Sequence, residues 1–140
     1  MKLINRDTDY AVKALLYIAR KSERVTISEL VEELGVPRPF LRKIFQILNK
    51  EGVLNSYKGK GGGFLLAIPP EHISMTDLIR IFQGQLKLKE CIINNMICPD
   101  VKTCPLRNRI HKIEKHIISE FNSITLASLF REDSTQWQKK

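Results

Sequence analysis

Apolar residues recur at intervals of three and four in the N-terminal part of the chain, and this spacing predicts a succession of short helices. The first is predicted from Asp9 to about Lys21, with Asp9 as its cap because a carboxylate accepts hydrogen bonds from the free amides of the first turn. Thr26 and Glu29 form a capping-box pattern ahead of the second helix. Gly35 is placed to end that helix, since glycine readily adopts a positive φ.

A third helix is predicted directly after a proline-containing turn. Pro39 suits the start of a helix, where its missing amide has no partner to lose, and the apolar repeat that follows ends near Gly52. Two helices joined by about four turn residues are typical of a helix-turn-helix unit. The third helix is therefore predicted to be the recognition helix.

Two short apolar stretches, 53–57 and 64–68, flank a glycine-rich turn after this helix. This pattern predicts a β-hairpin, which in this place would be the wing of a winged helix-turn-helix domain. The turn, Lys58-Gly59-Lys60-Gly61-Gly62-Gly63, lacks the G-x-x-x-x-G-K-[ST] order of a phosphate-binding loop and is followed by a strand. We therefore expect no nucleotide hydrolysis.

The C-terminal half is predicted to contain a short helix, a loop and one long helix. Ser74 and Asp77 are placed to cap the short helix, and Gly84 to end it. From Pro105 to about Phe130, apolar residues recur every three or four positions, a stripe longer than a small domain needs. Such a stripe favours a dimer interface; the alternative is a helix packed on its own domain.

These elements predict a mainly α-helical fold with a small β-hairpin, in which a winged helix-turn-helix domain is joined to a long C-terminal dimerisation helix. The expected parts are a DNA-binding domain at 1–70, a short helix and cysteine loop at 71–104, the dimerisation helix at 105–130 and a polar tail at 131–140. A chain of 140 residues suits one domain, and a helix shared with a second subunit would enlarge its core.

The charge balance points to a polyanionic partner. The chain has 23 lysines and arginines against 15 aspartates and glutamates, a net charge of +8. Basic residues gather at the start of the third helix, where arginine can donate paired hydrogen bonds to guanine, and beside the hairpin turn. The alternative is a set of solvated surface charges. The predicted DNA contacts are Arg38, Pro39, Phe40, Arg42, Lys43, Lys58 and Lys60.

Three cysteines, Cys91, Cys98 and Cys104, have the spacing C-x6-C-x5-C. Structural zinc sites draw ligands from C-x2-4-C pairs, so this wider spacing fits them poorly. Thiolates spread along a loop suit an iron–sulfur cluster. Cys104 also precedes Pro105 at a helix N-terminus, where the dipole favours the thiolate. The alternative is three ordinary buried cysteines.

The sequence indicates a cytoplasmic protein with no membrane partner. No apolar run approaches the length of a membrane span, and Met1–Asp7 lacks the features of a secretory signal. Cytoplasmic thiols are kept reduced, and three cysteines cannot all pair within one chain. Their proximity therefore favours metal, cluster or redox chemistry.

Four stretches carry a resemblance to a known family: the opening Asp9-Tyr10-Ala11-Val12, the residues from Leu41 to Leu48, the wing Gly59-x-Gly61-Gly62-Gly63-Phe64-Leu65-Leu66, and the three-cysteine loop before a long helix. On these the chain resembles the Rrf-type winged-helix regulators, which include the iron–sulfur cluster assembly regulator and the nitric-oxide-sensing repressor. The resemblance covers nearly the whole chain, and the wing and cysteine loop together are specific.

The resemblance implies a homodimeric repressor or activator whose three cysteines hold a [4Fe–4S] or [2Fe–2S] cluster. In the nitric-oxide-sensing branch, a carboxylate near the N-terminus of the partner subunit supplies the fourth ligand, and Asp9 matches that position. A cap of the first helix is the alternative role for Asp9. Asp7 and His111 are weaker candidates for the ligand.

The chain departs from the family pattern in two places. Six residues separate Cys91 from Cys98, where five is usual. The assembly-regulator branch has a histidine three residues after the last cysteine, and that position here is Arg107. Both departures weaken a cluster-assembly role and a histidine-capped [2Fe–2S] site.

The leading hypothesis is a dimeric transcription factor, with repression as the expected action, that binds a pseudo-palindromic operator in double-stranded DNA. Its cluster would respond to nitric oxide, redox state or iron–sulfur status and set the spacing of the two recognition helices. The alternatives are a cluster-free regulator controlled by thiol oxidation or a protein partner, and an iron–sulfur carrier with an acidic redox partner. An enzyme is disfavoured because no catalytic carboxylate pair or Ser-His-Asp set emerges.

Overall fold

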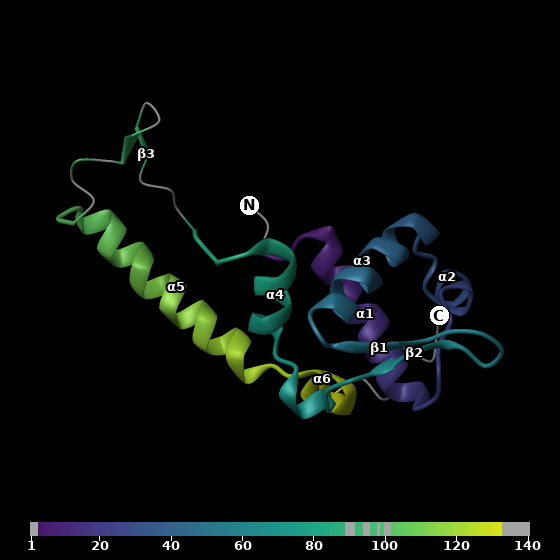
Figure 1. Cartoon of the computed structure of the whole chain (residues 1–140). Coiled ribbons are helices and arrows are strands. Elements are labelled where there is room, and N and C mark those ends of the chain that lie inside the picture. The colour runs from purple at the N-terminus through teal and green to yellow at the C-terminus, as the bar shows by residue number, and fades with distance from the viewer. Residues whose placement is uncertain (1–2, 89–91, 94–95, 98, 100–101, 133–140) are drawn as a thin grey trace.

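The computed structural model describes residues 3–88, 92–93, 96–97, 99 and 102–132 of the 140-residue chain. A helical body carries an antiparallel hairpin, and one long helix leads away from the body (Figure 1). The predicted mainly α-helical fold with a small β-hairpin is confirmed. In chain order the elements are α1 (Arg6–Lys21), α2 (Ile27–Leu34), α3 (Arg38–Lys50), β1 (Leu54–Tyr57), β2 (Gly63–Leu66), the 3₁₀ turn η1 (Pro70–His72), α4 (Met75–Gln83), β3 (Ile92–Ile93), β4 (Met96–Ile97), α5 (Pro105–Ser123) and α6 (Leu126–Glu132).

Helix α1 begins at Arg6 and not at Asp9. Its cap is Asn5, whose side-chain oxygen accepts a hydrogen bond of 2.8 Å from the backbone amide of Thr8. The predicted capping role of Asp9 is therefore wrong. Asp9 lies inside the first turn, where its charge complements the helix dipole. Asparagine and aspartate cap helices about equally well, so residue type alone did not favour Asn5.

Helices α2 and α3 form the predicted helix-turn-helix. The side-chain oxygen of Thr26 accepts a hydrogen bond of 3.1 Å from the amide of Glu29, and Gly35 ends α2 with a φ of 68°. The carboxylate of Glu29 pairs with Lys21 at the end of α1, and this hydrogen bond raises the pKa of the lysine. Pro39 occupies the first turn of α3, as its missing amide favours.

The core of the body lies where α3 packs on α1. Burying a leucine, isoleucine or phenylalanine side chain contributes roughly 1.5–3 kcal/mol, so this contact fixes the direction of α3. It also leaves the opposite face of α3 in solvent. The buried side chains that recur at intervals of three and four include Ala11, Ala14, Leu15 and Ile18 in α1 and Leu41, Ile44, Phe45 and Leu48 in α3.

The hairpin of β1 and β2 is the predicted wing, with Tyr57 paired opposite Gly63. It is joined to the body at Val25, which exchanges backbone hydrogen bonds with Phe64 at 3.0 and 2.9 Å. A Cβ atom at Gly63 would lie 2.8 Å from the carbonyl oxygen of Val25. Glycine at this position therefore permits the close approach of the two backbones.

Helix α5 ends at Ser123, so the single helix predicted from 105 to about 130 is wrong beyond that residue. Ile124 is extended, and Thr125 and Ser128 exchange side-chain and backbone hydrogen bonds of 3.0 and 3.1 Å at the start of α6. Serine and threonine offer the backbone such alternatives to a continuous helix. The apolar residues of α6 continue the spacing of three and four found in α5. The sequence pattern therefore gave no sign that one helix ends and another begins.

Helix α6 returns to the body and closes its core. The amide of Leu126 donates to the carbonyl of Ile73, and the amide of Met75 donates to the carbonyl of Ile124, both at 2.9 Å. Leu126 and Leu78 are almost fully buried in the same core as α1 and α3. The hydrophobic core therefore includes residues that follow the wing.

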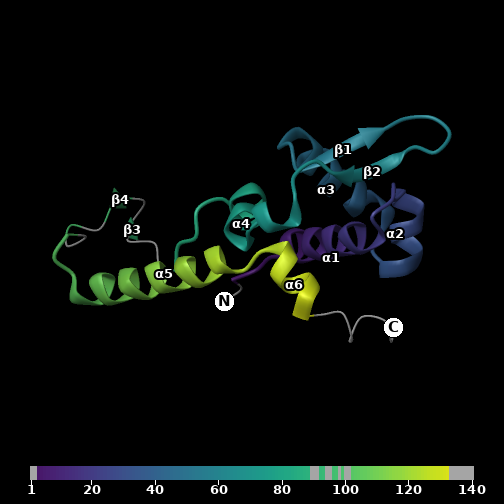
Figure 2. The same cartoon turned by 90° about the horizontal axis from the view of Figure 1, so that it is seen from below.

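Helix α5 contacts the body at α4 and then projects away from it (Figure 2). None of its residues is buried in the single chain. At its far end lie the paired strands β3 and β4. Within the part of the chain that the structure describes, no helix is both long and apolar enough to cross a membrane.

Candidate nucleic-acid interface and cysteine loop

The face of α3 opposite the core carries the predicted DNA contacts. Arg38, Pro39, Arg42 and Lys43 are all exposed. Because Leu41, Ile44 and Phe45 anchor the other face, these side chains are held on a fixed helix and point to solvent. The hairpin and α3 lie together on the side of the body away from α6 (Figure 2).

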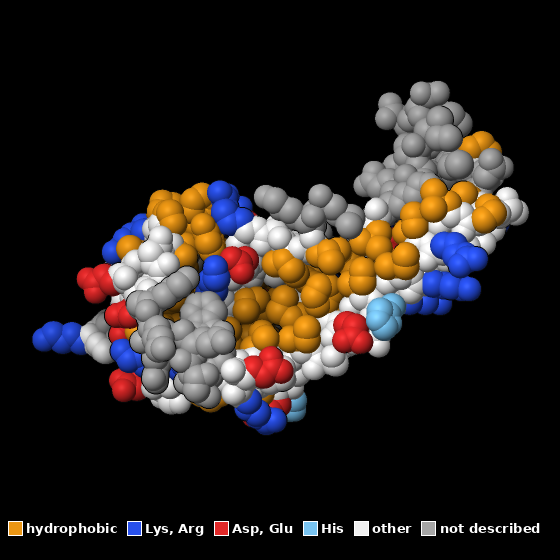
Figure 3. Space-filling model, turned by 180° about the vertical axis from the view of Figure 1, so that it is seen from behind, with side chains coloured by type: hydrophobic (Ala, Val, Ile, Leu, Met, Phe, Trp, Pro, Cys, Tyr) orange, Lys and Arg blue, Asp and Glu red, His pale blue; other side chains and the backbone are white. Residues whose placement is uncertain are grey.

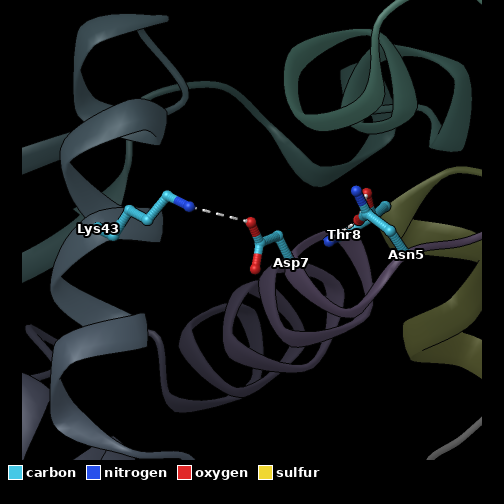
Figure 4. A network of polar contacts seen from close by, with 4 residues as sticks. All are labelled: Asn5, Asp7, Thr8 and Lys43. Carbon is cyan, nitrogen blue, oxygen red and sulfur yellow. Dashed lines mark hydrogen bonds and ion pairs between the residues drawn. The ribbon is translucent and has the colours of Figure 1, made fainter.

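Two of the basic residues on α3 make polar contacts within the chain. Arg38 donates a hydrogen bond of 3.0 Å to the hydroxyl of Ser28, which joins the first turns of α3 and α2. The ammonium of Lys43 lies 3.5 Å from a carboxylate oxygen of Asp7 at the start of α1 (Figure 4). Lys43 is 63% exposed, so this ion pair is weak and a phosphate could replace Asp7 as its partner.

Phe40 is half-buried, unlike the other predicted DNA contacts on α3, which are exposed. The guanidinium carbon of Arg6 lies 4.2 Å from the centre of its ring, and the ring of Tyr10 lies 6.3 Å away at an angle of 59°. Phe40 therefore packs the start of α3 against the start of α1. Its place in the structure is that of a support for the neighbouring basic residues.

The wing presents Lys58 and Lys60 at its tip, and both are exposed. A residue that the sequence analysis did not single out holds this turn from the body. Arg24 donates a hydrogen bond of 2.9 Å to the carbonyl of Gly61, and its guanidinium lies 4.0 Å above the ring of Tyr57. The sequence around Arg24 does not indicate this contact, because the wing residues that it touches lie more than 30 positions further along the chain.

Of the three predicted cluster ligands, Cys104 falls within the described residues; Cys91 and Cys98 lie outside them. Cys104 is half-buried and is the N-cap of α5, as its place before Pro105 predicted. The positive end of the helix dipole stabilises a thiolate there, which fits an iron ligand. The chemistry of the one donor that can be placed is thus compatible with an iron–sulfur cluster.

Asp9, the predicted fourth ligand, forms an ion pair of 2.9 Å with Lys13 one turn further along α1. Its side chain is 50% exposed. His111 faces Glu114 on α5, with 3.7 Å between Nδ1 and the carboxylate. Among the described residues of this single chain, no three histidine, cysteine, aspartate or glutamate side chains come together as a metal site.

Two contacts fasten the start of the cysteine loop to the rest of the chain. On α5, the carboxylate of Glu114 accepts a hydrogen bond of 2.7 Å from the backbone amide of Leu88. On α4, the side-chain oxygen of Gln83 lies 2.7 Å from the hydroxyl of Thr8 and accepts a hydrogen bond of 2.9 Å from the amide of Asn5. Thr8 is fully buried, so the last residue of α4 is fixed to the start of α1.

The comparisons with known proteins agree with this arrangement. The Rrf2 family model, described as an iron-dependent transcriptional regulator, matches residues 4–132. A protein of Aquifex aeolicus (strain VF5), whose given name classes it with the HTH-type transcriptional regulators, is 32% identical over 123 residues, which are 86% of this chain and 85% of that protein. Protein aau3 of Rhizobium meliloti (strain 1021) is 28% identical over 130 residues, 91% of this chain and 84% of that one.

Solved structures share the fold over nearly the whole chain. T. potens IscR has a TM-score of 0.76 at 26% identity, over 100% of this chain and 93% of that one. CymR (YrzC), the global cysteine regulator of B. subtilis, has a TM-score of 0.79 at 19% identity, over 94% and 98% of the two chains. With a winged helix-turn-helix body, a long C-terminal helix and a family match from residue 4 to residue 132, this chain belongs to the Rrf2 family of transcriptional regulators.

Proposed function

We propose that this chain is a cytoplasmic homodimeric repressor, without catalytic activity, that binds a pseudo-palindromic operator in double-stranded DNA. We further propose that an iron–sulfur cluster, [4Fe–4S] or [2Fe–2S], held by Cys91, Cys98 and Cys104 sets its affinity for DNA. One observation carries this proposal. The helix that ends at the cysteine loop, α4, is fixed by Gln83 to the start of α1, the helix on which the recognition helix packs.

The proposed DNA contacts are supported by their exposure and charge. Arg38, Arg42 and Lys43 lie on the first two turns of α3, the part of a recognition helix that enters the major groove. Lys58 and Lys60 lie at a thin wing tip that can approach the backbone or the minor groove. Pro39 would lie at the edge of this contact. Phe40 would act from behind it, through its packing on Arg6 and Tyr10.

A homodimer is supported by the apolar stripe on α5. Figure 3 shows hydrophobic side chains in a band that runs along this helix to the body. Leu106 and Ile113 are 54% and 52% exposed, and Ile110, Ile117 and Phe121 are half-buried. Large exposed apolar patches are rare on monomers, because covering them with a partner gains about 25 cal/mol for each Å² removed from water.

The cluster proposal is supported by the iron-dependent description of the family and by the place of Cys104 at the N-terminus of α5. A bound cluster would supply an inorganic centre that reacts with nitric oxide and oxidants. Asp9 of the partner would supply the fourth ligand after releasing Lys13, its partner within the chain. A carboxylate is a hard ligand that iron holds weakly next to soft thiolates, so this position would exchange readily.

The regulation follows from the attachments of the cysteine loop. The start of the loop is held by Gln83 of α4 and, at Leu88, by Glu114 of α5, and its other end leads into α5 at Cys104. A change in the loop would therefore alter how the body sits on the dimer helix. A two-fold operator requires recognition helices about 34 Å apart or a multiple of that distance. A small rotation of each body would therefore change the affinity for DNA.

Anaerobic purification tests the cluster proposal. The wild-type protein should contain iron and sulfide in equal amounts and absorb visible light, and nitric oxide should abolish that absorbance. Cys104→Ala should lose most of the iron, whereas Ser123→Ala, at the C-terminal end of α5, should retain it. A wild-type protein without iron or sulfide would contradict the cluster.

A cluster-free regulator controlled by thiol oxidation is the second candidate. The oxidized form of CymR from Staphylococcus aureus has the same fold, with a TM-score of 0.72 at 20% identity. That fold therefore accommodates a chain in an oxidised state. DNA binding by metal-free protein that changes with a thiol oxidant, and is restored by a reductant, would favour this candidate over the cluster.

A further inference from the structure

Arg24 contacts the wing at two places. Its guanidinium stacks on Tyr57, the last residue of β1, with 4.0 Å between the guanidinium carbon and the centre of the ring. Its Nη1 atom donates a hydrogen bond of 2.9 Å to the carbonyl of Gly61, on the far side of the turn. The next residue, Val25, pairs with Phe64 of β2. The segment at 24–25 is thus an anchor for both strands of the wing.

The turn that Arg24 contacts is costly to order. Gly59 and Gly61 have φ angles of 84° and 73°, and a Cβ atom at Gly62 would lie 2.6 Å from the carbonyl of Tyr57. The turn therefore requires its glycines, and glycine loses more conformational entropy on ordering than any other residue. Contacts that order the turn before DNA arrives would reduce the entropy lost on binding.

We propose that Arg24 is a positioning residue for DNA binding, which holds the wing turn so that Lys58 and Lys60 face the duplex. The inference rests on the proposed function, since it requires the wing to contact DNA. In this role the guanidinium acts through Tyr57 and Gly61 and does not itself bind phosphate.

The role requires the guanidinium group and not only a positive charge. A planar guanidinium stacks on an aromatic ring while its fork of donors is directed at a carbonyl. A lysine ammonium is a point charge without a planar face, so Arg24→Lys retains the charge and loses the combined contact. A direct phosphate contact would be kept largely by lysine, which separates the two roles.

The test is fluorescence anisotropy of the full-length protein with a duplex selected by the wild-type protein from a random-sequence pool, over a range of salt concentrations. Arg24→Ala and Arg24→Lys should each weaken binding about fivefold, with the slope of log affinity against log salt unchanged. Lys60→Ala should lower that slope by about one. Arg131→Ala, which removes an exposed arginine from α6, is the charge-matched control and should change affinity less than about twofold.

A double-mutant cycle shows whether Arg24 acts through the wing lysines. In a Lys58→Ala/Lys60→Ala background, adding Arg24→Ala should have almost no further effect on affinity. Trypsin should cleave after Lys58 and Lys60 faster in Arg24→Ala than in the wild type, because the turn is less ordered. Unfolding midpoints of the variants within a few degrees of the wild type would confirm that the body is intact.

Three results would overturn the inference. A smaller salt slope for Arg24→Ala together with full affinity in Arg24→Lys would make Arg24 a direct phosphate contact. An undiminished effect of Arg24→Ala in the double-lysine background would place its action outside the wing tip. If the double-lysine variant bound DNA as the wild type does, the wing contact of the proposed function would be wrong, and the positioning role with it.

Discussion

The winged body and helix α5 differ in what they bury. Helix α3 buries four apolar side chains in the core of the body, whereas the longer α5 buries none, and Leu106 and Ile113 on it stay more than half exposed. The body therefore has its own core, while the apolar face of α5 gains little from its own chain. The body therefore holds the recognition helix α3 in place by itself. We propose that dimerisation and sensing depend instead on α5 and the cysteine loop next to it.

The largest expected effect is on the stability of the body. Phe45→Ala should lower the free energy of unfolding by about 3–5 kcal/mol, because the ring is 1% exposed and its removal leaves a cavity. Ile113→Ala on α5 should change it by less than about 1 kcal/mol at protein concentrations low enough for dissociated chains. Denaturant titration of both variants measures the contrast. Equal losses would mean that α5 is part of the folded core of one subunit.

The next effect concerns assembly. Ile113→Glu should weaken the proposed dimer about a hundredfold, since each subunit would lose about 1.5 kcal/mol of apolar burial at the interface. Sedimentation velocity measures the dissociation, and circular dichroism should show an unchanged body. Asn122→Glu, a charge-matched change at an exposed polar position of α5, is the control. A protein that remains dimeric with Ile113→Glu would place the interface elsewhere.

A matched pair of threonines tests the joint between α4 and α1. Thr8→Val should cost about 1–3 kcal/mol, because its buried hydroxyl binds Asn5 and Gln83 and the valine would leave them without that partner. Thr76→Val should be neutral or slightly stabilising, since the buried hydroxyl of Thr76 has no hydrogen-bond partner among the residues that the structure describes. Thermal unfolding of the two variants provides the comparison. Similar losses for both would show that the Thr8 contacts add nothing to the joint.

The smallest effect distinguishes Asn5, which caps α1, from Asp9, which lies in its first turn. Asn5→Ala should cost about 1 kcal/mol, as expected for a lost helix cap. Asp9→Ala should change stability by less than about 0.5 kcal/mol, because an exposed i,i+4 ion pair contributes little. If Asp9 is a ligand, its substitution should instead change the iron content and visible spectrum of the anaerobic protein. An unchanged spectrum would remove it from the ligand set.

Sequence periodicity predicted the body well because its helices bury one face each. The spacing of Leu41, Ile44, Phe45 and Leu48 is sufficient to place α3 and its exposed basic face. The same periodicity failed at Ser123, where α6 continues the apolar register of α5 but packs on a different surface. Local hydrogen bonding, which the apolar pattern does not encode, decides such a break.

The contacts that position the candidate site were the least visible in the sequence. Arg24 and Tyr57 are distant in the chain, and Gln83 reaches Thr8 across most of the N-terminal half, so no local pattern reveals either contact. The cap of α1 depended on a choice between Asn5 and Asp9 that capping preference leaves open. The three-cysteine spacing remains a prediction for Cys91 and Cys98, which lie outside the described residues.

The most direct measurement compares the DNA affinity of one protein preparation with its iron–sulfur cluster and after the cluster is removed anaerobically, at the same salt concentration. A switch requires that the two states bind DNA with different affinities, since DNA that binds both states equally well would not respond to the loss of the cluster. We expect the cluster-loaded dimer to bind its selected duplex at least about tenfold more tightly than the stripped dimer, within the usual range of coupling between two sites. Equal affinities for all duplexes tested would contradict the proposed control of DNA binding by the cluster.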